Sequence, residues 1–288
     1  MQKIVVSPGI RKDNPVLQKI FRVLVWIFLV ALAAFTLIPF FWMISSSLKI
    51  DREVFAFPMR WLPETWHWEN YSLIWTRVPL LTYFRNTAFI AVMVTILQTL
   101  TSSFAAYAFA KLNFKGRDVL FLCYIGTIAV PWQAYMLPQF IMMGYMGLYD
   151  TPWAMICLQA FSAFGVFLMR QFYRSIPTDL CEAARLDGLS EYGIWARIML
   201  PLSKAAIATL VIFTFVNTWN DFMGPMIYLT ADENKTIQVG LRRFIQQYSS
   251  DYHLIMAASL MSLLPVSVVF LCLQRYFIEG IATSGLKG

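Results

Sequence analysis

Charged residues are scarce in this sequence, since Asp, Glu, Lys and Arg make up only 14% of its 288 residues. Apolar residues account for 59%, and the mean hydropathy is +0.59. An ordinary soluble domain has about 25% charged residues and a smaller apolar share. The shortage of charge therefore excludes a typical soluble domain and predicts an integral membrane protein.

Cysteine and histidine are scarce as well. The four cysteines form no Cys-x-x-Cys pair, and the two histidines, His67 and His253, are far apart in the chain. We therefore expect neither a disulfide framework nor a metal site. The apolar runs also lack the paired carboxylates or histidines that a membrane-embedded enzyme would need.

Six long stretches contain no charged residue, and they determine the expected fold. They cover residues 23–48, 86–110, 119–149, 151–169, 205–220 and 254–274. A helix needs about 20 apolar residues to cross a bilayer, and residues 222–230 extend the fifth stretch toward that length. The pattern predicts an all-α integral membrane protein with six transmembrane helices. The first stretch is far longer than the apolar part of a signal peptide, so we expect it to remain in the protein.

Proline occurs inside several of these stretches, most notably as Pro131 and Pro138 in the third. Proline leaves a backbone carbonyl without its helical partner, which membrane proteins tolerate where helices line a cavity. We therefore expect kinked or broken helices, an arrangement typical of transport proteins.

Basic residues are concentrated on one side of the predicted topology. They precede the first helix, follow the second and fourth, and follow the last: Lys3, Arg11, Lys12, Lys19, Arg22, Lys111, Lys115, Arg117, Arg170, Arg174, Arg185, Arg197, Lys204, Arg275 and Lys287. The positive-inside rule then places both termini in the cytoplasm. We expect a cytoplasmic arm at 1–20, a permease domain at 21–277 and a cytoplasmic tail at 278–288. This distribution also explains the net charge of +7 without nucleic acid.

One polar segment, PTDLCEAARLDGLSEYGIWARIMLP at 177–201, separates the fourth and fifth predicted helices. Asp179 with Glu182 predicts an N-cap and a capping-box partner, and Gly188 predicts the end of that helix. A second helix is expected to begin near Ser190 and to bury one apolar face, made of Ile194, Trp195, Ile198 and Met199. We therefore expect a compact helix-turn-helix at the cytoplasmic surface.

The exposed side of this helix-turn-helix is predicted to be a docking surface. It would offer the small side chains of Ala183 and Ala184 beside the charges of Glu182 and Arg185. Small residues allow another protein to approach closely, and charged residues set the register of the contact.

The same segment resembles the EAA loop of binding-protein-dependent ABC importer permeases. The family pattern is Glu-Ala-Ala, three residues, Gly, nine residues and Ile-x-Leu-Pro. The sequence matches it with Glu182, Ala183, Ala184, Gly188, Ile198, Leu200 and Pro201. The resemblance implies that these residues, together with Asp187, couple the chain to an ATPase. Further stretches, FPMRWLPETWHWENYSLIW, NTWNDFMGPMIYL, KTIQVGLRRF and GIATSGLKG, resemble the carbohydrate-uptake branch, especially the maltose-type second permease.

The resemblance implies a permease subunit that moves a carbohydrate across the bacterial cytoplasmic (inner) membrane by alternating access. The implied partners are a second homologous permease, two ABC ATPase subunits, an extracytoplasmic solute-binding protein and the membrane lipid. The chain itself would bind no cofactor, because ATP and Mg²⁺ would be held by the ATPase subunits. The tail GIATSGLK lacks the Gly-Lys pair and the following helix of a P-loop.

Polar and aromatic residues within the apolar stretches are candidates for sugar contacts, since amides match hydroxyls and aromatic faces stack on sugar rings. The candidates are Gln98, Trp132, Gln133, Thr214, Asn217, Trp219, Asn220 and Asp221. The same residues could instead only pack the helix bundle, and the second permease could supply most of the substrate contacts.

An ion-coupled secondary transporter is the alternative. Such a protein is expected to carry coupling groups near the bilayer midplane and often inverted repeats, and the sequence has no acidic residue near a predicted midplane and no visible repeat. The outer basic residues Arg77, Arg85, Arg242 and Arg243 would suit an acidic saccharide, a sugar phosphate or an acidic binding protein. A neutral oligosaccharide is the default expectation.

Overall fold

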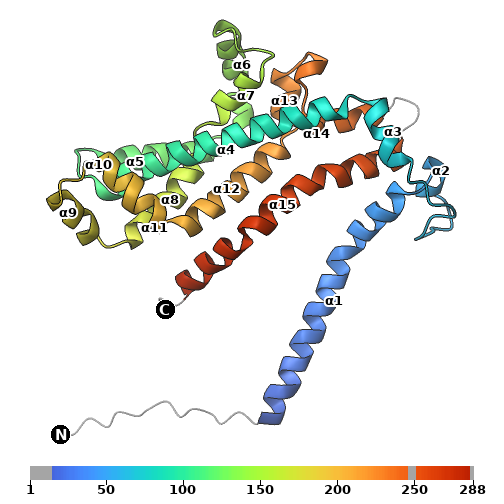
Figure 1. Cartoon of the computed structure of the whole chain (residues 1–288), viewed down its shortest axis with the longest axis horizontal. Helices are drawn as coiled ribbons and strands as arrows, with labels where there is room; N and C mark the ends of the chain where they lie inside the picture. The colour runs from blue at the N-terminus through green and yellow to red at the C-terminus, as the bar shows by residue number, and fades with distance from the viewer. Residues whose placement is uncertain (1–14, 246–250, 286–288) are drawn as a thin grey trace.

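The computed structural model describes residues 15–245 and 251–285, and these residues form the predicted all-helical architecture (Figure 1). Helix α1 (Pro15–Ser47) packs against α15 (Tyr252–Gly285) at one end and diverges from the other helices toward its start. The remaining helices are built around α4 (Leu80–Lys111), which packs against α8 (Ala163–Ser175) and α12 (Lys204–Trp219).

Three helices in the described residues are long and apolar enough to cross a membrane: Lys19–Ser47, Leu80–Lys111 and Tyr252–Tyr276. Two bent pairs raise the number to five if each pair counts as one span. Helix α7 (Pro152–Gln159) meets α8 at 41°, and the segment Glu191–Leu202 meets α12 at 82°. The chain is therefore a multi-span membrane protein, and the count of six stays a prediction.

The third predicted span, 119–149, is broken rather than continuous. It contains α5 (Arg117–Gly126), the 3-10 turns η1 (Thr127–Ala129) and η2 (Trp132–Ala134), and α6 (Met136–Tyr145). Val130 and Pro131 between the two turns are extended. Proline cannot donate a helical hydrogen bond and disfavours the helical conformation of the preceding residue. Pro138, by contrast, lies in the first turn of α6, where proline is tolerated.

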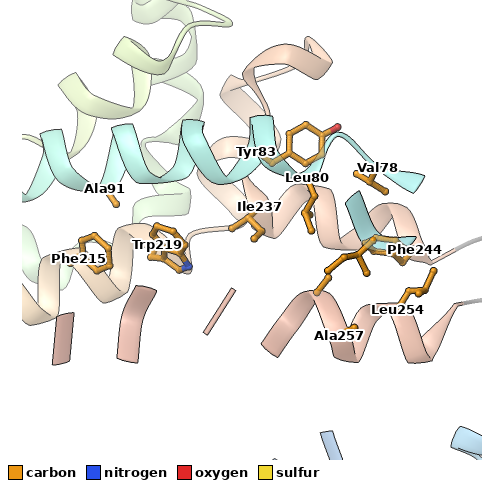
Figure 2. Packing of buried hydrophobic residues seen from close by; sticks show 12 residues of the cluster. Val78, Leu80, Tyr83, Ala91, Phe215, Trp219, Ile237, Phe244, Leu254 and Ala257 are labelled. Carbon is orange, nitrogen blue, oxygen red and sulfur yellow. The ribbon is translucent and has the colours of Figure 1, made fainter. Parts of the chain in front are cut away.

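A first core cluster joins α15 to the bundle at the end shown in Figure 2. It draws on α3 (Asn70–Arg77), α4, α12, α14 (Ile237–Leu241), η5 (Arg242–Phe244) and α15. Its largest buried side chain is Trp219, whose Nε1 donates a hydrogen bond to the carbonyl oxygen of Ser262 at 3.0 Å. The bond satisfies the polar atom of the indole, which is why Trp219 can be buried.

A second core cluster lies at the opposite end of α4. It packs α9 (Asp179–Leu186), α10 (Glu191–Ile194) and the π-helical turn η3 (Trp195–Met199) against α4, α5, α8 and α12. Gly165 of α8 lies directly against Ser102 of α4, where any Cβ would overlap the serine hydroxyl. Small residues at such crossings let membrane helices approach closely.

The remaining short elements are α2 (Asp51–Val54), α11 (Leu200–Leu202), α13 (Met223–Tyr228) and η4 (Asp232–Asn234). The helices α6, α7 and α13 gather on one side of α4 (Figure 1). Residues 1–14 of the predicted arm and 286–288 of the predicted tail lie outside the described residues. Helix α1 begins within the predicted arm, and α15 continues into the predicted tail.

Candidate functional site

A polar pocket with a volume of about 380 Å³ lies between α4, the junction of α7 and α8, α12, α13 and the broken segment at η2 and α6. Its lining is Gln98, Trp132, Tyr135, Gln139, Met155, Leu158, Gln159, Phe161, Ser162, Thr214, Asn217, Thr218, Asp221, Met223, Gly224 and Tyr228. This volume lies within the range of about 300–1,000 Å³ found for small-molecule sites. The lining combines amides, hydroxyls and aromatic rings.

One wall of the pocket is a hydrogen-bonded chain of side chains. Thr218 Oγ1 donates to Gln159 Oε1 at 2.9 Å, and Gln159 Nε2 donates to Asp221 Oδ2 at 2.8 Å. The other carboxylate oxygen, Asp221 Oδ1, accepts from the backbone N–H of Gly224 at 3.1 Å. Both oxygens of Asp221 are therefore partnered, so this carboxylate holds the wall together.

The other polar residues of the lining are less completely paired. Gln98 Nε2 donates to Thr214 Oγ1 at 3.0 Å, and Trp132 Nε1 donates to Gln139 Oε1 at 3.0 Å. Asn217 is exposed at the pocket, and its carboxamide makes no hydrogen bond to any residue in the described part of the chain. Asn217 is therefore the lining amide with a free donor and acceptor for a ligand.

The structure brings five of the eight predicted pathway residues to this pocket: Gln98, Trp132, Thr214, Asn217 and Asp221. The other three lie elsewhere. Gln133 is exposed outside the lining, Trp219 is buried in the first core cluster, and Asn220 faces a separate cavity, where it accepts a hydrogen bond from Gln238.

Helical periodicity explains this division. Thr214, Asn217 and Thr218 follow one another at spacings of three and one residues, which places them on one face near the end of α12, and Asp221 lies two residues beyond that end. Trp219 lies on another face of α12, and Asn220 caps its end. Sequence reasoning missed Gln139, Gln159, Tyr135 and Tyr228. Gln139 and Gln159 carried a usable signal, since each is an amide within a charge-free stretch.

The polar loop after α8 forms the predicted helix-turn-helix, with one change at its start. The N-cap of α9 is Thr178, without a side-chain cap bond, and Asp179 is the first helical residue. The predicted N-cap at Asp179 is therefore wrong by one position. In the first turn, its carboxylate still lies near the positive end of the helix dipole.

The turn itself follows the prediction. Gly188 has a φ of +82°, its N–H bonds to Arg185 O at 3.0 Å, and the N–H of Leu189 bonds to Ala184 O at 3.0 Å. These two bonds are those of a Schellman motif, in which glycine is the favoured left-handed residue. Ser190 then caps α10 by accepting from the N–H of Gly193 at 3.3 Å.

The predicted apolar face of the second helix is confirmed. Ile194 and Met199 are completely buried, and Trp195 and Ile198 pack beside them in the second core cluster. The segment then passes through Leu200 and Pro201 before the 82° bend into α12. Because of this bend, the loop lies across the end of the bundle rather than extending α12.

The outward face of α9 differs from the expectation at Ala184. This residue is only 4% exposed, because it packs into the second core cluster. The expectation that it would be exposed is therefore wrong. Glu182, Ala183 and Asp187 are exposed, and the neighbouring Leu186 is 90% exposed. The outward face thus presents two carboxylates, one small residue and one large apolar side chain.

Glu191 ties this loop to α4 through a hydrogen bond and joins the two helices of the loop through an ion pair. Arg185 Nε donates to Glu191 Oε1 at 2.7 Å, and Tyr107 of α4 donates to Glu191 Oε2 at 2.5 Å. The hydrogen bonds to Glu191 raise the pKa of the Arg185 guanidinium above its ordinary value. Glu191 therefore connects Arg185 of α9 with Tyr107 of α4, one of the helices long enough to cross a membrane.

The basic residues of the predicted outer loops differ in whether they form ion pairs. Arg243 and Lys235 both pair with Asp232, and these contacts lower the pKa of the Asp232 carboxyl to about 2. Arg77 and Arg85 make no ion pair within the described residues. Arg242 makes none either, so Arg243 is the only one of these four arginines that a carboxylate in the described residues neutralises.

Comparison with known proteins gives a consistent result. Residues 98–282 match the family model described as a binding-protein-dependent transport system inner membrane component. The chain is 32% identical to the arabinooligosaccharides transport system permease protein AraQ of Halalkalibacterium halodurans, over 96% of this chain and 99% of that protein. It is 33% identical to the melibiose/raffinose/stachyose import permease protein MelC of Bacillus subtilis, over 87% and 91%.

A solved structure is also similar over nearly the whole chain. It belongs to a bacterial ABC transporter involved in the import of the acidic polysaccharide alginate, with a TM-score of 0.79 and 26% sequence identity. The alignment covers 94% of this chain and 100% of the other.

Proposed function

The chain belongs to the family of inner membrane components of binding-protein-dependent transport systems, and we propose from this that it imports a carbohydrate as one of two permeases in an ATP-driven complex. It is a transport subunit of an ABC importer, and its family does not carry the ATPase site.

The chemistry of the polar pocket supports a carbohydrate. Sugars offer many hydroxyls, which are both donors and acceptors, and side-chain amides match this because they also carry both functions. The pocket holds three glutamines and Asn217, with the rings of Trp132 and Tyr135 beside them. Relatives named for arabinooligosaccharides and for melibiose, raffinose and stachyose support the same class.

Within this class, a neutral sugar fits the pocket best. Asp221, which is the carboxylate of the lining, has both oxygens bonded within the protein, and the lining contains no arginine or lysine to pair with an acidic sugar. We assign Asn217 to direct hydroxyl contact and Trp132 to ring stacking. Gln98 and Thr214, which bond each other, would exchange that bond for the substrate.

The exposed face of α9 supports docking to the ATPase subunits. Glu182, Ala183 and Asp187 lie on this face with Leu186, so an apolar contact is flanked by charges that can set register. Gly188, Ile198, Leu200 and Pro201 would position this face, and Ala184 would anchor it from below. ATP and Mg²⁺ would be held by the ATPase subunits, and an extracytoplasmic solute-binding protein would deliver the sugar.

The proposed topology has six spans with both termini in the cytoplasm. The sixth span is the broken segment from α5 to α6, which would cross the membrane while its interruption near Pro131 faces the pocket. Non-helical backbone at membrane depth is tolerated where it lines a cavity. Basic residues around Lys115 and Arg185 would then lie on the cytoplasmic side, as the positive-inside rule requires.

Transport would follow from alternating access. Closure of the ATPase dimer would move the docked loop, and the loop would move α4 through Glu191 and α12 through the bend at Ser203. Because α12 carries Thr214 and Asn217, its movement changes access to the pocket.

Uptake by the reconstituted complex tests this function. The two permeases and the ATPase would be placed in vesicles with the binding protein and a panel of neutral oligosaccharides and alginate fragments. We expect ATP-dependent uptake of a neutral oligosaccharide. The Asn217→Ala variant should take up the same sugar with a higher KM. Uptake that needs an ion gradient and no ATP would overturn the proposal, and uptake of alginate fragments alone would overturn the neutral substrate.

A further inference from the structure

A second cavity, of about 300 Å³, lies where α5 begins and α8 ends, away from the polar pocket. Three arginines from two helices line it: Arg117, Arg170 and Arg174. Lys115 lines an adjoining hollow that shares Arg117 with this cavity. Neither the sugar pocket nor the coupling face uses these residues.

Positive charge in this cavity exceeds what the protein neutralises. Arg117 Nε and Arg170 Nη2 donate to the same oxygen, Asp118 Oδ1, at 3.3 and 3.2 Å. Arg174 makes no hydrogen bond or ion pair with any residue that the structure describes. Three arginines thus face one carboxylate in this cavity, so positive charge is in excess there and attracts an anion from the surroundings.

The central guanidinium is held in place before any ligand binds. Arg170 is only 6% exposed, and its Nε donates to Phe109 O at 3.2 Å. Its guanidinium also lies 3.8 Å from the centre of the Phe121 ring. Its Nη1 makes no hydrogen bond to any described residue, so this fixed guanidinium still has a donor for a phosphate oxygen.

The surroundings of the cavity are those of a lipid headgroup. The α5 side chains that follow it, Val119, Leu120 and Leu122, are large, apolar and exposed. Under the proposed topology, on which this inference rests, the arginines lie at the cytoplasmic surface and these apolar residues at the depth of the acyl chains. Basic pockets of this kind on the cytoplasmic side bind anionic headgroups.

We propose that this cavity binds the phosphate of an anionic phospholipid, with Arg117, Arg170 and Arg174 as the anion ligands and the exposed side of α5 contacting the acyl chains. The bound lipid would join the start of α5 to the end of α8. It would therefore stabilise the helices that hold the coupling loop.

Thermal unfolding of the delipidated complex in mild detergent tests the proposal. Phosphatidylglycerol is added to one sample, phosphatidylcholine to a second and inorganic phosphate to a third. We expect only phosphatidylglycerol to raise the Tm of the native complex. Arg174→Gln should need about tenfold more phosphatidylglycerol for the same rise, the loss expected for one charge-assisted contact. Arg174→Lys should need an intermediate concentration of phosphatidylglycerol, since lysine keeps the positive charge but not the two parallel donors of the guanidinium.

Lys204→Gln is the matched control, because it removes one exposed positive charge from the same side of the membrane and outside the cavity. It should respond like the native complex. The proposal would be overturned if the same concentration of phosphatidylglycerol raised the Tm of Arg174→Gln as much as that of the native complex. Stabilisation by inorganic phosphate alone would make this a site for free phosphate. If Arg174→Gln instead releases a partner subunit with or without lipid, the occupant is a protein. None of these readouts depends on sugar uptake.

Discussion

At Gly188 the backbone leaves α9 with a φ of +82°, and two hydrogen bonds to the last turn of the helix close the motif. A Cβ at this position would meet no atom within 4 Å, so space does not demand glycine. The backbone conformation does, because a left-handed residue with a β-branched side chain is strained. The position therefore discriminates between side chains by conformation alone.

We predict that Gly188→Val abolishes most sugar uptake and weakens binding of the ATPase subunits. The cost of forcing a β-branched residue into this conformation is about 1–3 kcal/mol, enough to displace the end of α9. Gly188→Asn is the matched variant, since asparagine tolerates left-handed geometry. It should retain most uptake in the vesicle assay. Equal behaviour of the two variants would show that the turn does not control coupling.

Gly224 presents the opposite situation, because space rather than conformation restricts it. A Cβ there would lie 2.6 Å from Asp221 Oδ2 and 2.6 Å from Met155 Cε. We predict that Gly224→Ala displaces the Asp221–Gln159 pair at a cost of about 1–3 kcal/mol and raises KM for the sugar. Assembly with the ATPase should be unchanged. Gly126→Ala, where a Cβ meets nothing within 4 Å, should leave KM unaltered.

Among the elements, the loop at 177–201 is bound to α4 through Glu191, whose Oε2 accepts from Tyr107 while its Oε1 accepts from Arg185 of α9. A hydrogen bond to a charged group contributes about 1.5–3 kcal/mol. We predict that Tyr107→Phe loosens this connection, so that ATP is hydrolysed with fewer sugars moved per ATP. The ratio of uptake to hydrolysis measures the effect. Tyr192→Phe is the control, because that exposed tyrosine stacks on Phe104 without a hydroxyl bond among the described residues. An unchanged ratio in Tyr107→Phe would contradict the rigid connection.

The local features of the loop could be predicted from sequence because they depend on neighbouring residues. Gly188 and Ser190 have the backbone preferences of a helix end and a helix start, and both occupy those positions. The burial of a side chain could not be predicted in the same way. Ala184 follows Ala183 with the same side chain, yet only Ala184 faces the second core cluster. Which alanine is buried depends on how α9 lies against α4 and α8, which the loop sequence does not contain.

The pocket likewise depends on contacts between elements that are far apart in the sequence, and these could not be predicted from it. One face of α12 could be recognised from its polar spacing, and it lines the pocket. Gln159 joins that face from an element 59 residues away in sequence from Thr218, and only the packing of α7 against the bundle reveals the contact. The break at Pro131 was foreseeable as an irregularity. The sequence could not show that Trp132 would line the pocket and Gln133 would not, because this depends on how the chain between α5 and α6 packs against the bundle.

For the whole molecule, the orientation in the membrane is the property on which substrate delivery, coupling and lipid binding all depend. We predict that a membrane-impermeant thiol reagent labels Glu233→Cys in intact cells but labels Asp187→Cys only after the membrane is opened. Both positions are exposed, so accessibility to the reagent reflects the side of the membrane. The native cysteines would first be replaced by alanine. Labelling of both positions from outside would refute the six-span topology.

We propose that this permease works in a complex, with α9 as its contact to the ATPase. The most direct measurement is purification of the tagged chain from native membranes in mild detergent, with the bound proteins identified by mass spectrometry. We predict a second permease and an ATPase with a P-loop, with the ATPase lost when Glu182 and Gly188 are both replaced and the second permease retained. A chain that purifies alone, under conditions in which a control importer stays intact, would contradict the claim.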